Sequence, residues 1–281
     1  MSFALLMGLN QVMVKVVNSG IAPVFQVALR SLCAFFPILV FALLMRRRLS
    51  LTDGSFWPGI VSGLFFALEF VLMFSALEYT TVTRAALFFY CMPFWVALGA
   101  HFLIPGEQLS FWRVVGLLLA VAGVALALYR SDTPSGDKAF IGDMMCLMGS
   151  AFWAGIALLA RTTKLSRSTP EMQLLYQLAV SAVVLMLVVP LFGDPIRELT
   201  PFIVSLFAIQ VLLVVCVGFL TWFWVLSIYP ASDMASFTFL TPLFGMMMGW
   251  LLLDEAVTWN LLLALVLVAL GIVLVNRRSA Q

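Results

Sequence analysis

Residues that could carry chemistry are scarce in this chain. Charged side chains make up 10% of the 281 residues, and the single histidine is His101. The sequence contains no zinc-binding histidine pair, no glycine-rich phosphate loop ending in lysine and no aspartate pair inside an apolar run. We therefore expect no catalytic residue, no metal site and no cofactor, and we interpret His101 as a satisfied interface residue.

Several polar residues lie inside otherwise apolar runs, where a polar group without a partner is costly. The ones that we single out are Asn10, Gln11, Lys15, Arg30 and Glu69. Asn10 and Gln11 suit either interhelical hydrogen bonds or a path for a polar solute. Lys15 lies near the end of its run, where a lysine can snorkel to a polar boundary. Arg30 and Glu69 suit either a structural ion pair or the coordination of a substrate or ion.

Aromatic residues make up 14% of the chain and fall into two groups. The tryptophans near the ends of apolar runs are typical of interfacial anchors: Trp57, Trp112, Trp250 and Trp259. Tyr90, Trp153 and Trp222 lie deep inside their runs. An aromatic wall at that depth would suit apolar or aromatic solutes, through stacking and cation–π contact with an ammonium group. Packing against lipid or protein is the alternative for each of them.

The composition predicts where the chain folds. Hydrophobic residues make up 64% of it, against ~45–50% in a soluble domain, where charged residues reach ~25%. Such a surface suits a lipid bilayer and not water. The net charge of +2 gives no reason to expect a nucleic-acid partner. We therefore predict an all-α integral membrane protein.

Short polar segments divide the chain into ten apolar runs, most of which reach the ~17–25 residues that a membrane-spanning helix needs. The runs are Phe3–Val17, Val24–Met45, Phe56–Leu77, Val82–Leu103, Phe111–Tyr129, Ile141–Ala160, Met172–Phe192, Phe202–Leu226, Met234–Leu253 and Trp259–Val275. The longest polar stretch lies near the middle and reads as a linker. We therefore predict two five-helix halves, residues 1–130 and 141–281, joined by a linker over residues 131–140.

Basic residues predict the orientation of these spans, because loops on the cytoplasmic side carry an excess of lysine and arginine. If the N-terminus lies inside, the inner loops hold the arginine run Arg46-Arg47-Arg48 and most of the other basic residues. An even number of spans then returns the C-terminus to the same side. We expect both termini in the cytoplasm and the protein in the cell (inner) membrane.

Depth in the membrane brings two opposite charges to one level. At 1.5 Å per residue, Arg30 lies about 9 Å and Glu69 about 12 Å from the outer face. Either charge alone would cost ~2.5–3.5 kcal/mol on insertion scales. We predict that Arg30 and Glu69 pair directly or through one water, with Lys15 as the alternative partner of Glu69.

The two halves share a pattern of residues at nearly constant spacing. Leu6-Met7-Gly8 recurs as Leu147-Met148-Gly149, and Pro23-x-x-Gln26 recurs as Pro170-x-x-Gln173. The further matches are Pro93 with Pro242, Glu107 with Glu255, and Gly123 with Gly271. Because each half has an odd number of spans, the second enters the membrane inverted. Inverted repeats are typical of secondary transporters, which bind substrate near mid-membrane between the repeats.

Two of the repeated residues predict bent helices. Pro93 and Pro242 lie inside the fourth and ninth runs. Each lacks a backbone N–H and should kink its helix. We expect the two kinks to be equivalent and to shape the gates of the protein.

Ten spans in two five-span repeats resemble the drug/metabolite transporter superfamily, in the branch built from two EamA-type repeats. The stretches that carry the resemblance are Gly8 to Lys15, Ala28-Leu29-Arg30, Gly106-Glu107-x-x-Ser110 and Asp254-Glu255-x-x-Thr258. Within that family the chain is most similar to the bacterial aromatic amino-acid exporters. It departs from the commoner pattern at Leu9, since a Trp–Gly pair is frequent where Met7-Gly8 stands.

The resemblance implies a secondary transporter that exports amino acids or similar metabolites from the cytoplasm by alternating access. It implies a small solute and the lipid bilayer as partners, and it leaves open coupling to protons and the choice between monomer and homodimer. Two other classes remain as alternatives. An integral membrane enzyme acting on lipid would need a compact acid–base or metal constellation, and a scaffold subunit would lack a hydrated polar cavity.

Overall fold

The computed structural model describes residues 2–106, 108–129, 138–218 and 240–276. The helices of the N-terminal half are α1 (Ser2–Val17), α2 (Pro23–Leu44), α3 (Phe56–Ala76), α4 (Val82–Phe89), α5 (Met92–Leu103) and α6 (Phe111–Tyr129). Those of the C-terminal half are α7 (Ala139–Thr162), η1 (Lys164–Arg167), α8 (Pro170–Val188), η2 (Val189–Phe192), α9 (Pro201–Ile209), η3 (Gln210–Gly218), α12 (Leu240–Leu253) and α13 (Trp259–Asn276). Over these ranges the fold is helical, apart from one isolated bridge between Ile21 and Ile196.

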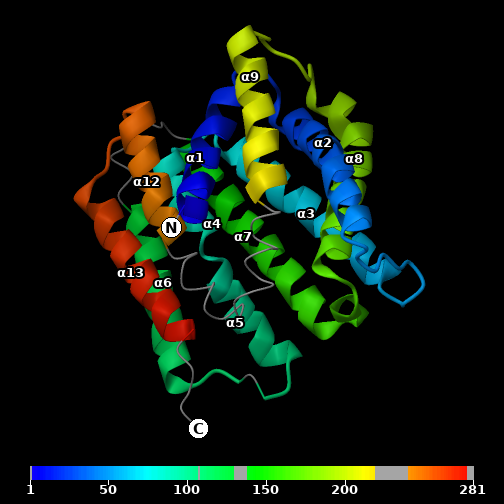
Figure 1. Cartoon of the computed structure of the whole chain (residues 1–281). Coiled ribbons are helices and arrows are strands. Elements are labelled where there is room, and N and C mark those ends of the chain that lie inside the picture. Colours follow the sequence, from blue (N-terminus) through cyan, green and yellow to red (C-terminus); the bar gives the residue numbers. More distant parts are fainter. Residues whose placement is uncertain (1, 107, 130–137, 219–239, 277–281) are drawn as a thin grey trace.

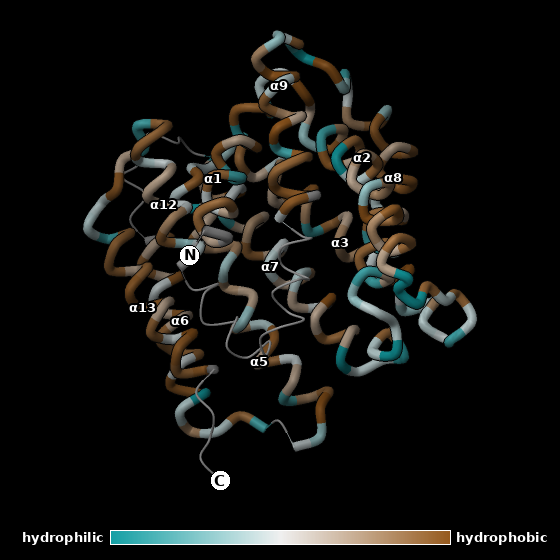
Figure 2. Tube along the Cα trace, viewed as in Figure 1, coloured by the Kyte–Doolittle hydropathy of each residue, from teal (hydrophilic) through white to brown (hydrophobic). Residues whose placement is uncertain are grey.

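The chain is a membrane protein by the length and the surface of its helices. Within the described residues, six helical segments are long and apolar enough to cross a bilayer, and four shorter apolar helices accompany them. The outward faces carry large apolar side chains such as Phe36, Leu187 and Trp259. Figure 2 shows hydrophobic residues along the helices and hydrophilic residues gathered in the connecting segments. This distribution matches contact with lipid tails around the helices and with water at their ends.

Local signals in the sequence explain where several helices begin. Thr81, Thr169 and Thr200 each accept a hydrogen bond from a backbone N–H in the first turn of the helix that follows. Threonine is a favoured N-cap because its hydroxyl satisfies a donor that the helix leaves free. Proline at the start of α8 and α9 fits the same turn, since its missing N–H would have no helical partner there.

The helices of the two halves pack against each other more than within their own half. The most extensive contacts join α6 with α13, α3 with α7, α2 with α8, and α1 with α12. In Figure 1, α6 and α13 form one edge of the molecule, α2 and α8 lie at the opposite edge, and α1, α4 and α7 lie between. The interface between the halves therefore runs through the centre of the protein.

Glycines set the closest of these approaches, between α6 and α13. A Cβ atom on Gly116 would lie 2.6 Å from the carbonyl oxygen of Gly271, and one on Gly271 would lie 2.5 Å from that of Gly116. A Cβ on Gly123 would lie 2.8 Å from the carbonyl oxygen of Ala264. Small residues allow backbones to touch in this way inside membranes. The pairing of 116 with 271 and of 123 with 264 shows that the two helices run antiparallel.

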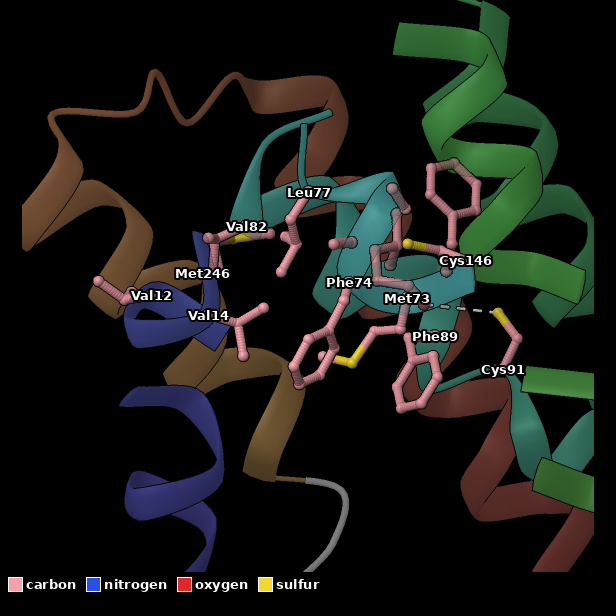
Figure 3. Packing of buried hydrophobic residues seen from close by; sticks show 14 of the residues in the cluster. Val12, Val14, Met73, Phe74, Leu77, Val82, Phe89, Cys91, Cys146 and Met246 are labelled. Atoms are coloured by element: carbon pink, nitrogen blue, oxygen red, sulfur yellow. Dashed lines mark hydrogen bonds between the residues drawn. The ribbon is translucent and has the colours of Figure 1, made fainter. Parts of the chain in front are cut away.

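The largest apolar core lies where the two halves meet (Figure 3). It brings together Val14 of α1, Phe74 of α3, Phe89 of α4, Cys146 of α7 and Met246 of α12. These side chains come from both halves of the chain, so the core fixes the halves to one another rather than stabilising each alone.

The fourth predicted run is two helices and not one. α4 ends at Phe89 and α5 begins at Met92, which leaves Tyr90 and Cys91 between them. Pro93 follows in the first turn of α5, where its missing N–H removes a hydrogen bond that a continuous helix would need. Pro242 lies in the first turn of the described part of α12, and the residues that precede this helix lie outside the described ranges.

The eighth predicted run changes its helical geometry part way along. It begins as α9 and widens at Gln210 into the π-helix η3. π-Helical segments are rare and occur frequently at functional sites, because they redirect side chains relative to an α-helix. Gln210, at the transition, is fully buried.

Candidate functional site

An aromatic stack fills the break between α4 and α5. The ring of Phe89 lies parallel to that of Trp153, with centroids 5.2 Å apart and an interplanar angle of 19°. The ring of Tyr90 meets Trp153 edge to face at 5.7 Å. Trp153 comes from the middle of α7, so the stack joins the two halves at the point where the fourth span is interrupted. Tyr90 and Trp153 are only half-buried, which leaves part of each ring uncovered.

Arg30 is held by aromatic rings and not by a carboxylate. Its guanidinium lies 4.4 Å from the ring centre of Phe70 and 5.3 Å from that of Phe74, both on α3. This cation–π arrangement stabilises a charge that is only 5% exposed. The ion pairs within the described ranges do not include Arg30 with Glu69, so the direct form of the predicted pair is not present. A bridge through water stays a prediction.

Glu69 lies beside these rings and next to the aromatic stack. It is 3% exposed, and it interacts electrostatically with Arg30. Gly149 of α7 packs on both neighbours, because a Cβ there would lie 3.3 Å from the Glu69 carbonyl oxygen and 3.4 Å from the Phe89 ring. Nη1 of Arg30 and Oε2 of Glu69 are among the buried side-chain atoms of the described residues that have no hydrogen-bond partner. We call Arg30, Glu69, Phe70, Tyr90 and Trp153 the central cluster.

The two amides of the first helix have different surroundings. Asn10 accepts a hydrogen bond from Gln210 at 3.1 Å, and Gln210 in turn accepts one from Gln26 at 3.2 Å. This chain of amides links α1, α2 and the start of η3. Asn10 therefore forms an interhelical hydrogen bond, which is one of the two roles that its sequence position suits. Gln11 is buried, and neither of its amide atoms has a partner in the described part of the protein.

Lys15 pairs with Glu255 and not with Glu69. Its Nζ donates to Oε1 of Glu255 and to the carbonyl oxygen of Thr80, both at 3.0 Å, and its side chain is 30% exposed. Glu255 also accepts hydrogen bonds from the backbone N–H groups of Val82 at 2.8 Å and Thr83 at 2.9 Å. A carboxylate at the start of α4 satisfies donors that the first turn leaves free, and it holds Lys15 as well. This contact ties the end of α1 to α4 and to the segment after α12.

A buried ion pair that the sequence analysis did not identify joins α4 to α7. Arg84 and Asp143 are 1% and 0% exposed, and Arg84 donates to the carboxylate through both Nε and Nη2. Asp143 accepts a third bond from the hydroxyl of Thr80 at 2.7 Å. The sequence does indicate such a pair, because Asp143 lies two residues inside an apolar run, where a buried carboxylate needs a partner.

The other predicted residues either have contacts outside the central cluster or lie outside the described ranges. His101 accepts a hydrogen bond from the backbone N–H of Leu109 at 3.3 Å. Trp57, Trp250 and Trp259 are exposed near helix ends. Trp222 and Glu107 lie outside the described residues. Over the described ranges, no group of three or more histidine, cysteine or acidic side chains lies close enough to hold a metal ion.

Comparison with known proteins agrees with this architecture. The model of the EamA-like transporter family matches residues 1–129 and 140–277. Uncharacterized transporter YoaV of Bacillus subtilis is 24% identical over 96% of this chain and 93% of its own. The probable amino-acid metabolite efflux pump of Escherichia coli is 26% identical over 94% of this chain and 89% of its own. One crystal structure, 19% identical, covers 98% of this chain and 97% of that chain with a TM-score of 0.64, which shows a shared fold.

Proposed function

The chain belongs to the EamA-like transporter family, and from that premise we propose that it exports small metabolites, amino acids including aromatic ones, by alternating access. The two halves, residues 1–130 and 141–281 with a linker over 131–140, are inverted five-helix repeats that give ten spans. Both termini lie in the cytoplasm, with the protein in the inner membrane. The solute binds at the central cluster.

The symmetric packing of the halves carries the proposal. In the order of the two halves, α1 corresponds to α7, and the pair α4 and α5 corresponds to α12. Exchanging these counterparts turns the contact of α1 with α12 into that of α7 with α4 and α5. The same exchange leaves the pairs α6 with α13 and α2 with α8 unchanged. The same correspondence relates Gly123 to Gly271 and Gly116 to Ala264. It therefore relates the contact of Gly123 with Ala264 to the contact of Gly271 with Gly116, and both contacts are present. Two inverted halves that pack alike can exchange conformations, which exposes one site to each side in turn.

The nature of the solute is supported by the central cluster and by one relative. A cluster that combines a guanidinium, a carboxylate and uncovered aromatic rings suits a small molecule with both charges and an apolar part. The Escherichia coli relative is named as an amino-acid metabolite efflux pump. A membrane enzyme acting on lipid has no support from the named relatives, which are transporters.

The test is flux of labelled solutes into liposomes that contain the purified protein. A panel of amino acids is measured with and without a pH gradient, and protein-free liposomes are the control. We expect saturable flux of aromatic amino acids that depends on the protein. Flux of no amino acid in the panel would contradict the proposed solute class. Dependence on the pH gradient would add proton coupling, and independence would indicate facilitated diffusion.

The orientation has a test of its own. A C-terminal reporter that is active only outside the cytoplasm should stay silent in cells, because an even number of spans and the basic inner loops keep both termini inside. The same reporter fused after Glu198, in the exposed segment between η2 and α9, should be active. The reverse result would overturn the proposed orientation.

A further inference from the structure

The two charges of the central cluster are each buried without a full set of partners. Arg30 has no hydrogen-bond partner at Nη1, and Glu69 has none at Oε2. A buried charged group that lacks a partner costs more than the hydrogen bond it could make is worth. Most buried polar groups in proteins have a hydrogen-bond partner, so each of these two atoms needs an explanation.

The two charges interact electrostatically but do not form an ion pair in the described part of the protein. The rings of Phe70 and Phe74 lie against the guanidinium of Arg30 and fix its position. Glu69 precedes Phe70 on α3 and interacts with Arg30 electrostatically without forming an ion pair within 4.0 Å. The two atoms without partners are therefore one hydrogen-bond donor and one acceptor of opposite charge, on side chains that interact electrostatically.

We propose that Arg30 and Glu69 are the two ends of a clamp for a zwitterionic amino acid. Nη1 of Arg30 donates to the α-carboxylate, and Oε2 of Glu69 accepts from the α-ammonium group. A zwitterion carries both complementary charges on adjacent atoms, so it satisfies both residues at once and adds no net charge to the site. This assignment rests on the proposed function and identifies the solute by its main-chain charges.

The aromatic stack supplies the part of the site that would face the solute's side chain. Gly149 places Glu69 and Phe89 against the same turn of α7, and Trp153 lies one turn further along that helix. The partly uncovered rings of Tyr90 and Trp153 suit an apolar or aromatic side chain. The charges would thus select α-amino acids in general, and the rings would favour phenylalanine-like members of that class.

The test compares three forms of one ligand on the purified full-length protein in lipid nanodiscs. Phenylalanine carries both charges, phenylalanine methyl ester lacks the carboxylate, and N-acetylphenylalanine lacks the ammonium. Binding is measured by competition with radiolabelled phenylalanine. Since a hydrogen bond to a charged group is worth ~1.5–3 kcal/mol, the loss of either charge should weaken binding about 10- to 100-fold.

Two variants assign each charge to its residue. Arg30→Met should remove the preference for phenylalanine over the methyl ester and keep the preference over N-acetylphenylalanine. Glu69→Gln, which keeps the shape of the side chain, should do the reverse. Arg48→Met and Glu198→Gln change the same residue types at exposed positions and should leave all three affinities unchanged.

The outcomes separate this inference from the function on which it rests. If the wild-type protein binds the ester or the N-acetyl compound as tightly as phenylalanine, the clamp is wrong even where flux of amino acids is observed. If both variants lose all three ligands equally, the two residues are structural and the clamp is again wrong. A variant that fails to fold leaves the wild-type comparison to decide. Absence of amino-acid flux in liposomes would instead contradict the proposed function.

Discussion

At the residue scale, the charged and aromatic side chains of the apolar runs separate into two groups. Arg84 forms an ion pair with Asp143, and Lys15 forms one with Glu255, which also accepts hydrogen bonds from the first turn of α4. Arg30 and Glu69 do not form one in the described part of the protein, although they are buried as well. Ion pairs between buried charges join helices, whereas a buried charge without an ion-pair partner is a candidate for contact with a ligand. The distinction rests on contacts, which the sequence does not show.

Trp153 tests the aromatic part of the site. Trp153→Ala removes the ring that stacks on Phe89 and meets Tyr90. We expect a rise of about 2- to 10-fold in the concentration of phenylalanine that half-saturates flux, because an aromatic pair is typically worth ~0.5–1.5 kcal/mol beyond its apolar contact. Expression and the size-exclusion profile should change little. Trp259→Ala, at an exposed position, is the control, and unaltered kinetics in Trp153→Ala would remove this residue from the site.

The pair Arg84 and Asp143 tests structural burial of charge. Asp143→Asn leaves the buried guanidinium without its counter-charge and should lower the stability of the protein by about 3–5 kcal/mol. The double variant Arg84→Met with Asp143→Leu should lose less than the sum of the single changes. The measurement is a double-mutant cycle on thermal unfolding in detergent. Additive losses would show that the two residues do not act as a pair.

The sequence identified some of these charged residues as unusual but did not identify their partners. Depth in the span identified Arg30 and Glu69 as exceptional, because the rise of a helix fixes depth from residue number alone. Depth did not identify partners. Lys15 and Glu255 are 240 positions apart in the chain, and only the packing of α1 beside α4 and α12 brings them together.

At the element scale, the protein combines helices in close backbone contact with helices that are interrupted. Run lengths predicted most helix bounds to within a few residues, since α6 begins at Phe111 and α13 at Trp259, as expected. The break at Tyr90 and the π-helix at Gln210 were not predicted, although Pro93 indicated a bend. A proline shows where a hydrogen bond is missing, but the tertiary contacts decide whether the helix bends or separates.

The contact between α6 and α13 predicts two equivalent glycine substitutions. Gly116→Val and Gly271→Val each place a branched side chain against a backbone carbonyl of the other helix. Overpacking of this kind should lower stability by about 1–3 kcal/mol, by a similar amount at both sites because the contact is reciprocal. Thermal unfolding in detergent measures it, with Leu118→Val on the exposed face of α6 as the control. Tolerance of valine at both glycines would contradict the close approach.

The two prolines test the proposed gates. Pro93→Ala restores a backbone donor at the break between α4 and α5, and Pro242→Ala does so in the first turn of the described part of α12. If the breaks shape gates, each change should alter the maximal rate of flux more than the concentration that half-saturates it, since the central cluster is untouched. Rates that equal the wild type in both variants would make the prolines purely structural.

At the scale of the whole molecule, the fold class was accessible from sequence and the packing of its helices was not. Sixty-four per cent hydrophobic residues and ten apolar runs are enough to indicate a helical membrane protein. The runs are apolar on nearly every side, so their periodicity does not show which face meets protein and which meets lipid. The pairing of α6 with α13 and of α3 with α7 therefore comes from the structure alone.

We propose that the two like halves expose one solute site alternately to each side of the membrane. The most direct test of alternating access is counterflow, the exchange of labelled for unlabelled solute. Liposomes that hold the purified protein are loaded with unlabelled phenylalanine and diluted into a trace of labelled phenylalanine. Alternating access predicts a transient accumulation of label above its equilibrium level, because the returning carrier is occupied mainly by unlabelled solute. A smooth approach to equilibrium without that overshoot, in liposomes that show saturable flux, would contradict the account.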